Sequence, residues 1–251
     1  MKDYLATVVR NGKIAENIHE ITFLLDEDVK VRAGQFGNIS VGGTHLLRRP
    51  IAICKAEGRE VTFCYQIKGE GTKKLKEVEA GTRLSVLLPL GNGFFVEETE
   101  KKVALVGGGV GVFPLISVVK AYAQTKEISA YIGYRNQGAV CGVEDFKQAK
   151  KFVAVTDDGS YGEKMNAVQA FEKALQNGER PDVVLACGPT PMLRALVALV
   201  KAEGLPCYVS LEERMGCGIG ACLVCVCDKT DGQKARVCKD GPVFNANDVV
   251  L

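Results

Sequence analysis

The stretch 103–114 (VALVGGGVGVFP) predicts a buried strand, a glycine-rich turn and the start of a helix. Glycines let the backbone of the turn approach a ligand closely. Backbone amides and a helix N-terminus exposed at such a turn suit a pyrophosphate, although a turn that serves only packing in an α/β domain is the alternative. The candidate nucleotide-binding residues are therefore Gly107, Gly108, Gly109 and Gly111.

Buried strands alternate with helical stretches downstream of this turn. Such alternation is typical of a doubly wound α/β domain with a parallel sheet. Further strands are expected at 128–134, 152–155, 183–186 and 208–211. Helices are expected at 113–123, 143–149, 166–175 and 191–202.

A second turn, 186–192 (ACGPTPM), follows another buried strand and opens a helix. Cys187, Gly188 and Pro189 would lie at the carboxyl end of that strand, where open α/β sheets bind ligands. A core thiol before a proline-started helix is the alternative. The strand at 128–134 ends without the carboxylate that usually holds a ribose; Arg135 follows it, so the choice between NAD and NADP stays open.

The first hundred residues predict short strands. In 61–68 (VTFCYQIK), large apolar residues alternate with smaller or polar ones, which indicates a half-buried strand. Glycine-bearing breaks recur at short intervals, a pattern typical of a small antiparallel β-barrel. The charged run 97–102 reads as a linker. We therefore predict three units: 1–98 as a barrel, 99–211 as the α/β domain and 212–251 as a small module.

The last unit contains a cysteine motif with the spacing C-x4-C-x2-C-x12-C. This is the plant-type ferredoxin pattern for a [2Fe–2S] cluster, and its ligands would be Cys217, Cys222, Cys225 and Cys238. A structural zinc site is the alternative, but zinc modules usually carry paired C-x2-C knuckles. Cys227 is a fifth cysteine, which strand alternation favours as a small core residue rather than a ligand.

Composition narrows the functional class. The 251 residues carry a net charge of +2, which argues against a nucleic-acid binder. Two histidines, His19 and His45, leave few candidates for a general base. The uncharged stretch 103–119 contains four glycines and a proline and is at the short limit for a membrane span. We expect no membrane association and a cytoplasmic chain with reduced thiols.

The order of barrel, glycine turn, Cys-Gly-Pro and ferredoxin-like cysteines resembles the ferredoxin–NADP reductase superfamily. Within it, the stretch 212–222 (EERMGCGIGAC) resembles the electron-transfer subunits of class 1B dihydroorotate dehydrogenases. The resemblance covers nearly the whole chain. It assigns the FAD site to three segments, namely Arg49-Pro50-Ile51-Ala52, Cys64-Tyr65-Gln66 and Gly71-Thr72.

Within that resemblance, Arg49 would pair with the FAD phosphate, and the segment 156–160 would line the nucleotide site. Many members carry a serine hydroxyl near flavin N5 at the position of Ala52, and alanine cannot supply that hydrogen bond. Without the family, Arg48 and Arg49 would read as an exposed basic pair.

The resemblance implies a chain that binds NAD, FAD and a [2Fe–2S] cluster. A nicotinamide transfers two electrons together, a cluster takes one at a time, and a flavin connects the two. The expected partner is an FMN-containing dihydroorotate dehydrogenase catalytic subunit. Two copies of each chain would form a heterotetramer, which would act in pyrimidine biosynthesis. Analogous subunits of sulfhydrogenases or ferredoxin-dependent transhydrogenases are the alternative. A second alternative, from another functional class, is a module that is stabilised by zinc and senses a nucleotide without redox chemistry.

Overall fold

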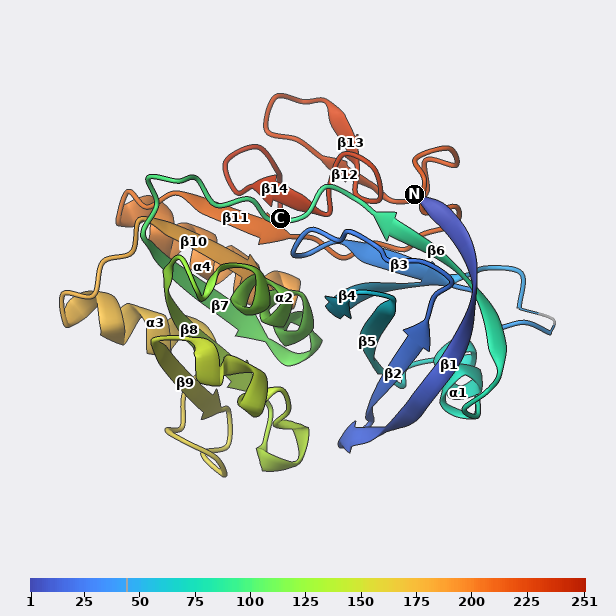
Figure 1. Ribbon diagram of the computed structural model, residues 1–251. Helices are drawn as coiled ribbons and strands as arrows, with labels where there is room; N and C mark the ends of the chain where they lie inside the picture. The colour runs from blue at the N-terminus through green and yellow to red at the C-terminus, as the bar shows by residue number, and fades with distance from the viewer. Residues whose placement is uncertain (44) are drawn as a thin grey trace.

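The computed structural model describes residues 1–43 and 45–251 and divides into a barrel, an α/β sheet and a C-terminal module (Figure 1). Six antiparallel strands close the barrel in the order β1-β2-β5-β4-β3-β6. Their bounds are β1 Lys2–Ala15, β2 Ile18–Leu24, β3 Phe36–Ile39, β4 Arg49–Glu57, β5 Glu60–Gln66 and β6 Arg83–Leu90.

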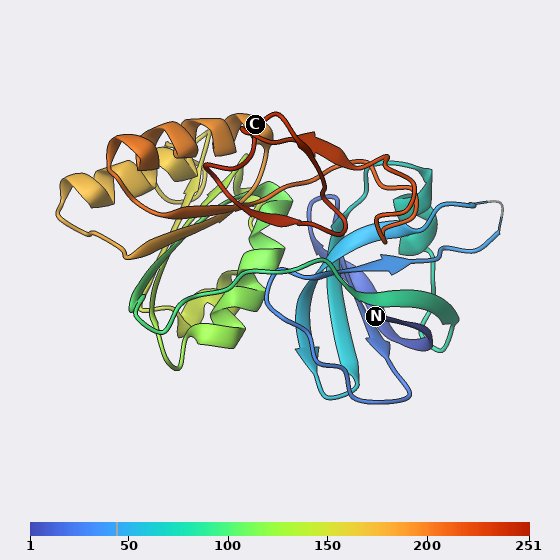
Figure 2. The same ribbon diagram turned by 90° about the horizontal axis from the view of Figure 1, so that it is seen from above.

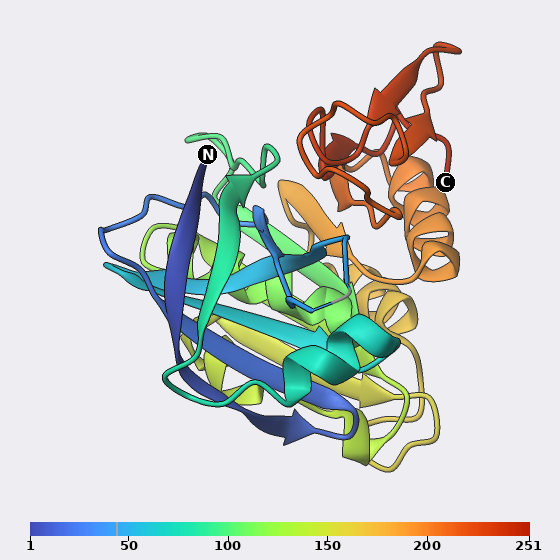
Figure 3. The same ribbon diagram turned by 90° about the vertical axis from the view of Figure 1, so that its right-hand side faces the viewer.

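Tight turns fix the barrel hairpins. β1 and β2 pair at Ala15 and Ile18, and Asn17 between them takes a left-handed φ of 57°. β4 and β5 join through Gly58, whose φ is also 57°. These are the conformations that asparagine and glycine tolerate best. Helix α1, Glu70–Lys76, lies against the barrel and buries Leu75 in its core (Figure 3).

The second domain is a six-stranded sheet in the order β14-β11-β10-β7-β8-β9. The five strands β7 Lys102–Gly108, β8 Glu127–Tyr134, β9 Lys151–Thr156, β10 Val183–Cys187 and β11 Cys207–Ser210 are parallel. Helix α2, Val112–Tyr122, contacts both this sheet and strand β4 of the barrel. Helices α3, Ala167–Gln176, and α4, Thr190–Ala202, pack against each other and the sheet.

The C-terminal module lies across the top of both domains in Figure 1 and along their junction in Figure 2. It holds a short hairpin of β12, Val226–Asp228, and β13, Lys234–Arg236. Strand β14, Val243–Asn245, then joins the sheet antiparallel to β11. The module therefore shares the sheet of the domain before it, and the predicted boundary at 211/212 remains a prediction.

The predicted fold class, a barrel followed by a doubly wound α/β domain and a cluster module, is confirmed. Differences are local. The helix expected at 143–149 is a 3₁₀ helix, η3 Val143–Gln148, and the glycine turn itself forms η1, Gly109–Gly111; a third, η2, spans Gln137–Ala139. One of the glycine-bearing breaks of the first hundred residues, at 69–71, opens helix α1 instead of joining two strands. Among the described residues, no helix is long and apolar enough to cross a membrane.

Candidate functional site

A cleft of about 310 Å³ lies between the barrel and the α/β domain. The barrel wall carries most of the residues predicted for FAD, and the facing wall carries Val110, Pro114 and Cys187. The predicted residues that line it together are Pro50, Ile51, Ala52, Cys64, Tyr65, Gln66, Thr72 and Cys187. Two separately predicted groups of residues therefore share one cleft.

Arg49 and Gly71 lie next to the cleft and touch each other. A Cβ on Gly71 would stand 1.7 Å from Arg49 Nε, so only glycine leaves room for the guanidinium. Arg49 Nη1 donates to the Leu47 carbonyl at 2.7 Å. Arg48, in contrast, is held by Asp3 at 2.8 Å, so the two arginines are not an exposed basic pair. The geometry suits an arginine kept in place for an anionic group.

Thr72 has a local task in this wall. Its hydroxyl oxygen accepts hydrogen bonds from the backbone N–H groups of Lys68, at 2.9 Å, and Gly69, at 3.2 Å. These are the bonds of a helix N-terminal cap. Thr72 therefore fixes the first turn of α1, on which Gly71 meets Arg49.

The two turns predicted for nicotinamide nucleotide lie side by side, because β7 and β10 are neighbours and Gly107 pairs with Cys187. This is the point where the strand order reverses, the usual ligand crevice of such sheets. A Cβ on Gly111 would stand 2.3 Å from the Cys187 carbonyl oxygen, and one on Gly108 would stand 3.3 Å from Pro189. Gly109 has a φ of 57° and open space beside it. The two turns are thus packed closely against each other at Gly108 and Gly111, whereas Gly109 leaves open space beside them.

Gly188 completes this contact, since a Cβ there would stand 3.1 Å from the Gly108 backbone nitrogen. Within 156–160, the Ser160 hydroxyl accepts from the Gln137 backbone N–H at 2.7 Å, which ties the segment to the end of β8. Arg135 is exposed at that same end.

Cys187, which is buried, and Glu212, which is exposed, both line the cleft. Burial raises the pKa of the Cys187 thiol. Desolvation in the cleft raises the pKa of the Glu212 carboxyl, with Lys68 opposing. Glu212 was not among the predicted site residues. The signal for it was an acidic pair, Glu212 and Glu213, directly after a buried strand at the crevice edge.

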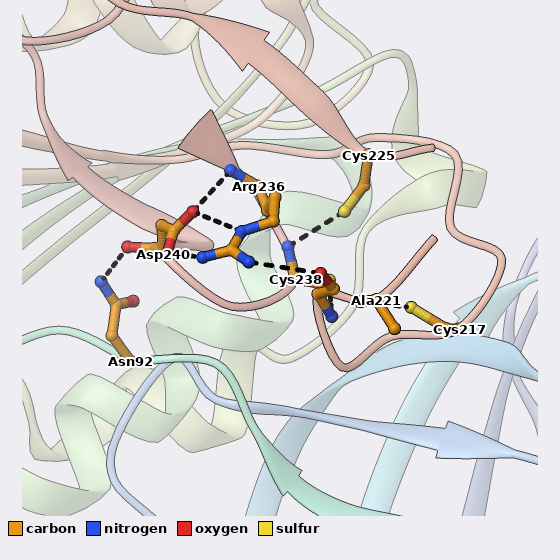
Figure 4. A network of polar contacts seen from close by, with 8 residues as sticks. Asn92, Cys217, Ala221, Cys225, Arg236, Cys238 and Asp240 are labelled. Carbon is orange, nitrogen blue, oxygen red and sulfur yellow. Dashed lines mark hydrogen bonds and ion pairs between the residues drawn. The ribbon is translucent and has the colours of Figure 1, made fainter. Parts of the chain in front are cut away.

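The four motif cysteines are arranged as two pairs in the loops of the C-terminal module, and Figure 4 shows the pair of Cys225 and Cys238. Cys217 N donates to Cys222 Sγ and Cys222 N donates to Cys217 Sγ, both at 3.4 Å. Cys238 N donates to Cys225 Sγ at 3.4 Å. Two pairs suit two irons with two thiolates each.

Backbone N–H groups converge on these sulfurs. Cys217 Sγ accepts from Ile219, Ala221 and Cys222 at 3.3–3.4 Å, and Cys238 Sγ accepts from Gly220 at 3.1 Å. Burial acts to raise the pKa of Cys217, but the N–H groups outweigh it and lower that pKa to about 6. The loop is therefore built to hold a thiolate, and its donor set fits an iron–sulfur cluster.

Side chains brace the loop from outside. Arg236 pairs with Asp240 at 3.0 Å and donates from Nη1 to the Gly220 carbonyl at 3.3 Å (Figure 4). Asn92 Nδ2, from the end of the barrel, donates to the Asp240 carbonyl at 3.1 Å. The cysteine loops are thus tied to the barrel that carries the cleft.

Cys227 lies half-buried on β12, paired in register with Ala235. The paired sulfurs favour a two-iron cluster.

Two family models match the chain. "Iron-sulfur cluster binding domain of dihydroorotate dehydrogenase B" matches residues 212–250, and "Oxidoreductase NAD-binding domain" matches residues 105–198. A solved NADH-dependent reduced ferredoxin–NADP oxidoreductase superposes with a TM-score of 0.87 at 28% identity, over 98% of this chain and 90% of that one. A ferredoxin reductase of carbazole 1,9a-dioxygenase, at 19% identity and a TM-score of 0.72 over 82% of this chain and 67% of that one, shows the shared fold.

These matches confirm the predicted set of cofactors, namely an iron–sulfur cluster, FAD and NAD. Full-length relatives are closer in sequence. The electron transfer subunit of dihydroorotate dehydrogenase B (NAD⁺) from Bacillus pumilus is 42% identical over 100% of this chain and 99% of its own length. The subunit from Caldanaerobacter subterraneus is 39% identical over 98% of each chain. The chain therefore belongs to the family of dihydroorotate dehydrogenase B (NAD⁺) electron transfer subunits.

Proposed function

We propose that this chain carries electrons between NAD and an FMN-containing dihydroorotate dehydrogenase catalytic subunit, through FAD and a [2Fe–2S] cluster. The proposal gives FAD the cleft, NAD the crevice between β7 and β10, and the cluster the cysteines Cys217, Cys222, Cys225 and Cys238. Dihydroorotate would be oxidised on the partner subunit in pyrimidine biosynthesis. NAD⁺ would be the final acceptor.

The observation that carries the proposal is the continuity of one segment. Residues 210–213 and Met215 line the cleft, and Cys217 follows Met215 by two positions. The wall of the proposed flavin site therefore leads directly to the first proposed cluster ligand. Such proximity is what transfer of single electrons between the two groups requires.

In this proposal the residues of the chain hold the bound FAD and NAD in place. Arg49 presents a guanidinium beside Gly71, where charge-assisted hydrogen bonds would hold a phosphate. The packed pair of Gly111 and Cys187 brings the nucleotide crevice to the edge of the cleft. When bound, FAD supplies the exchange between hydride and single-electron chemistry. The chain needs no nucleophile for this task.

The partner would dock over the cysteine loop. Three apolar residues there are strongly exposed: Ile219 at 42%, Leu223 at 61% and Val224 at 54%. Exposed apolar residues gathered in one place are typical of interaction sites. We propose this surface for the catalytic subunit, with two of each chain forming a heterotetramer.

Anaerobically purified protein provides the test. We expect FAD and about two irons per chain, with visible absorbance from both. NADH should reduce artificial acceptors, whereas dihydroorotate should be oxidised only after the catalytic subunit is added. A colourless, iron-free protein, or dihydroorotate turnover by this chain alone, would contradict the proposal.

A transhydrogenase-type or sulfhydrogenase subunit is the second candidate. It is favoured by the likeness to the NADH-dependent reduced ferredoxin–NADP oxidoreductase, which extends over 98% of this chain. Identity is lower there, 28% against 42%. Co-purification of this chain from its source cell distinguishes the two candidate functions, because each predicts a different FMN-containing or metal-containing partner protein.

A further inference from the structure

Strand β3 connects the cleft with the cysteine loop through alternate side chains. Gly37 and Ile39 pack into the barrel, Gly37 against Phe63 and Ile39 in the core cluster. Phe36 and Asn38 belong to the opposite face of the strand. Phe36 lines the cleft, and Asn38 contacts the loop that carries Cys217.

Asn38 is a buried polar residue, 1% exposed, with an unequal set of hydrogen bonds. Its Nδ2 donates to the Cys217 carbonyl oxygen at 3.4 Å. A Cβ on Gly218 would stand 2.6 Å from that same Nδ2, so the amide lies directly against the Cys217–Gly218 peptide. Asn38 Oδ1 accepts a hydrogen bond from none of the described residues.

Asn92 offers a comparison within the same molecule. It also reaches from the barrel to the C-terminal module. Its Nδ2 donates to the Val243 carbonyl at 2.8 Å, and its Oδ1 accepts from Val243 N at 3.1 Å. Asn92 is therefore a fully satisfied bridge between domains, as expected of a structural asparagine.

A buried acceptor without a donor is unfavourable for folding, so its retention calls for an explanation other than stability. Reversing the amide would not relieve it, because Oδ1 would then face the Cys217 carbonyl oxygen. What the side chain provides is a fixed position for the Cys217–Gly218 peptide. That peptide begins the loop whose N–H groups, from Ile219, Ala221 and Cys222, point at Cys217 Sγ.

We propose that Asn38 is a positioning residue for the iron–sulfur cluster, acting through the Cys217–Gly218 peptide to hold the N–H groups that tune its reduction potential. This inference rests on the proposed function, since it presumes a cluster at Cys217. Donors to the sulfurs favour the reduced cluster, which carries more negative charge. Loosening the loop should therefore make the potential more negative.

The test compares Asn38→Leu with Asn92→Leu in the complete, cluster-loaded protein. Leucine has similar bulk to asparagine and removes both the donor and the orphaned acceptor. We expect Asn38→Leu to have a melting temperature close to that of the wild type. At a fixed potential, the ratio of reduced to oxidised cluster should fall by about 3- to 10-fold. A 10-fold fall corresponds to about 59 mV for one electron. Its electron paramagnetic resonance spectrum should change as well.

Asn92→Leu loosens the module from outside, through the Asp240 and Val243 carbonyls, so it should lower the melting temperature more than Asn38→Leu does and shift the potential less. An unchanged potential and spectrum in Asn38→Leu would overturn the proposal. An equal shift in both variants would also overturn it, because general loosening between barrel and module would then explain the effect. If Asn38→Leu does not fold, the reduction potential and the electron paramagnetic resonance spectrum of Asn38→Ala are measured instead, with the same expected changes. A wild-type protein without iron would instead contradict the proposed function.

Discussion

At the scale of single residues, the site depends on a few side chains that the backbone around them has prepared. The Cys217 thiol is partly exposed and surrounded by N–H donors, which hold its pKa at about 6. The Cys187 thiol is fully enclosed, and burial raises its pKa. The two cysteines thus differ in chemical character: Cys217 favours the thiolate, which suits the ligand role proposed for it, and Cys187 is a buried thiol in the wall of the cleft.

The cysteine assignment makes the first prediction. Replacing a ligand sulfur by a hydroxyl should lower the affinity for the cluster by about 100-fold or more, beyond the range for outer-shell groups. We expect Cys217→Ser to lose iron and the visible absorbance of the cluster. Cys227→Ser is the matched control, since it lies in the same module and should retain both. Iron loss in Cys227→Ser alone would contradict the ligand set.

The raised pKa of Glu212 leads to a prediction about the pH dependence of stability. Desolvation in the cleft raises the pKa of its carboxyl in the folded state, so the folded chain binds more protons than the unfolded chain and stability falls as the pH rises above the unfolded value. Glu212→Gln removes that dependence. We expect the variant to melt higher than the wild type at pH 8, with the difference shrinking towards pH 5. Glu213→Gln, which removes the same charge from the adjacent position, is the control, and equal behaviour of both variants would contradict the argument.

At the scale of elements, close approach of the two glycine turns explains why their composition is so restricted. The 3₁₀ turn η1 lies against the end of β10, and the gap between them admits no Cβ at position 111. The first turn of α1 lies against Arg49 at the start of β4 in the same manner. Each contact joins two elements that are distant in sequence.

Gly111→Ala tests the first of these contacts. The added methyl would meet the Cys187 carbonyl at 2.3 Å, and overpacking of this kind costs about 1–3 kcal/mol of unfolding free energy. Displacement of the crevice should lower kcat/KM for NADH with an artificial acceptor by roughly tenfold or more. Gly12→Ala, in the open on β1, should change neither quantity. Normal NADH kinetics in Gly111→Ala would argue against a nucleotide site here.

Arg49→Gln tests the second contact. Loss of a charge-assisted hydrogen bond to phosphate costs about 1.5–3 kcal/mol, or roughly 10- to 100-fold in affinity. We expect that weakening in FAD retention, measured by fluorescence of the released flavin. Arg59→Gln, exposed at the β4–β5 turn, is the control. Full retention of FAD in Arg49→Gln would remove the phosphate role from this arginine.

At the scale of the whole molecule, three units meet along one line that runs from crevice to cleft to cysteine loop. The C-terminal module is joined to the sheet through β14 and to the barrel through Asn92. Its outer face carries the exposed apolar residues Ile219, Leu223 and Val224. The proposed path of electrons therefore ends at a surface suited to a second protein.

Leu223→Asp tests that surface. Leu223 has a φ of 58°, a conformation that aspartate tolerates better than leucine, so the fold should be retained. We expect the affinity for the catalytic subunit to fall by at least tenfold, since a charge would be buried in an apolar contact. Cluster content should be unchanged. Ile14→Asp, similarly exposed on the barrel, should bind the partner normally; equal loss in both would refute this docking face.

The features that could be predicted from the amino-acid sequence alone are those encoded within short segments of the chain. The spacing of Cys217, Cys222 and Cys225, the glycine turn at 107–111 and the alternation of strands with helices each lie within a few turns of chain, where local geometry decides the outcome. These motifs predicted the iron–sulfur cluster, a candidate nucleotide turn and the α/β domain, whereas the FAD site and the family were implied by the resemblance.

Contacts between residues distant in sequence appear only in the folded chain. Asn38 lies against Cys217, 179 positions away, and Glu212 lines the cleft because β11 ends beside the barrel. Strand β14 completes the sheet of the preceding domain, which no local pattern signals. Such contacts depend on the closure of a barrel and the order of strands in a sheet. These are set by the packing of the whole chain, and periodicity within a segment carries no information about them.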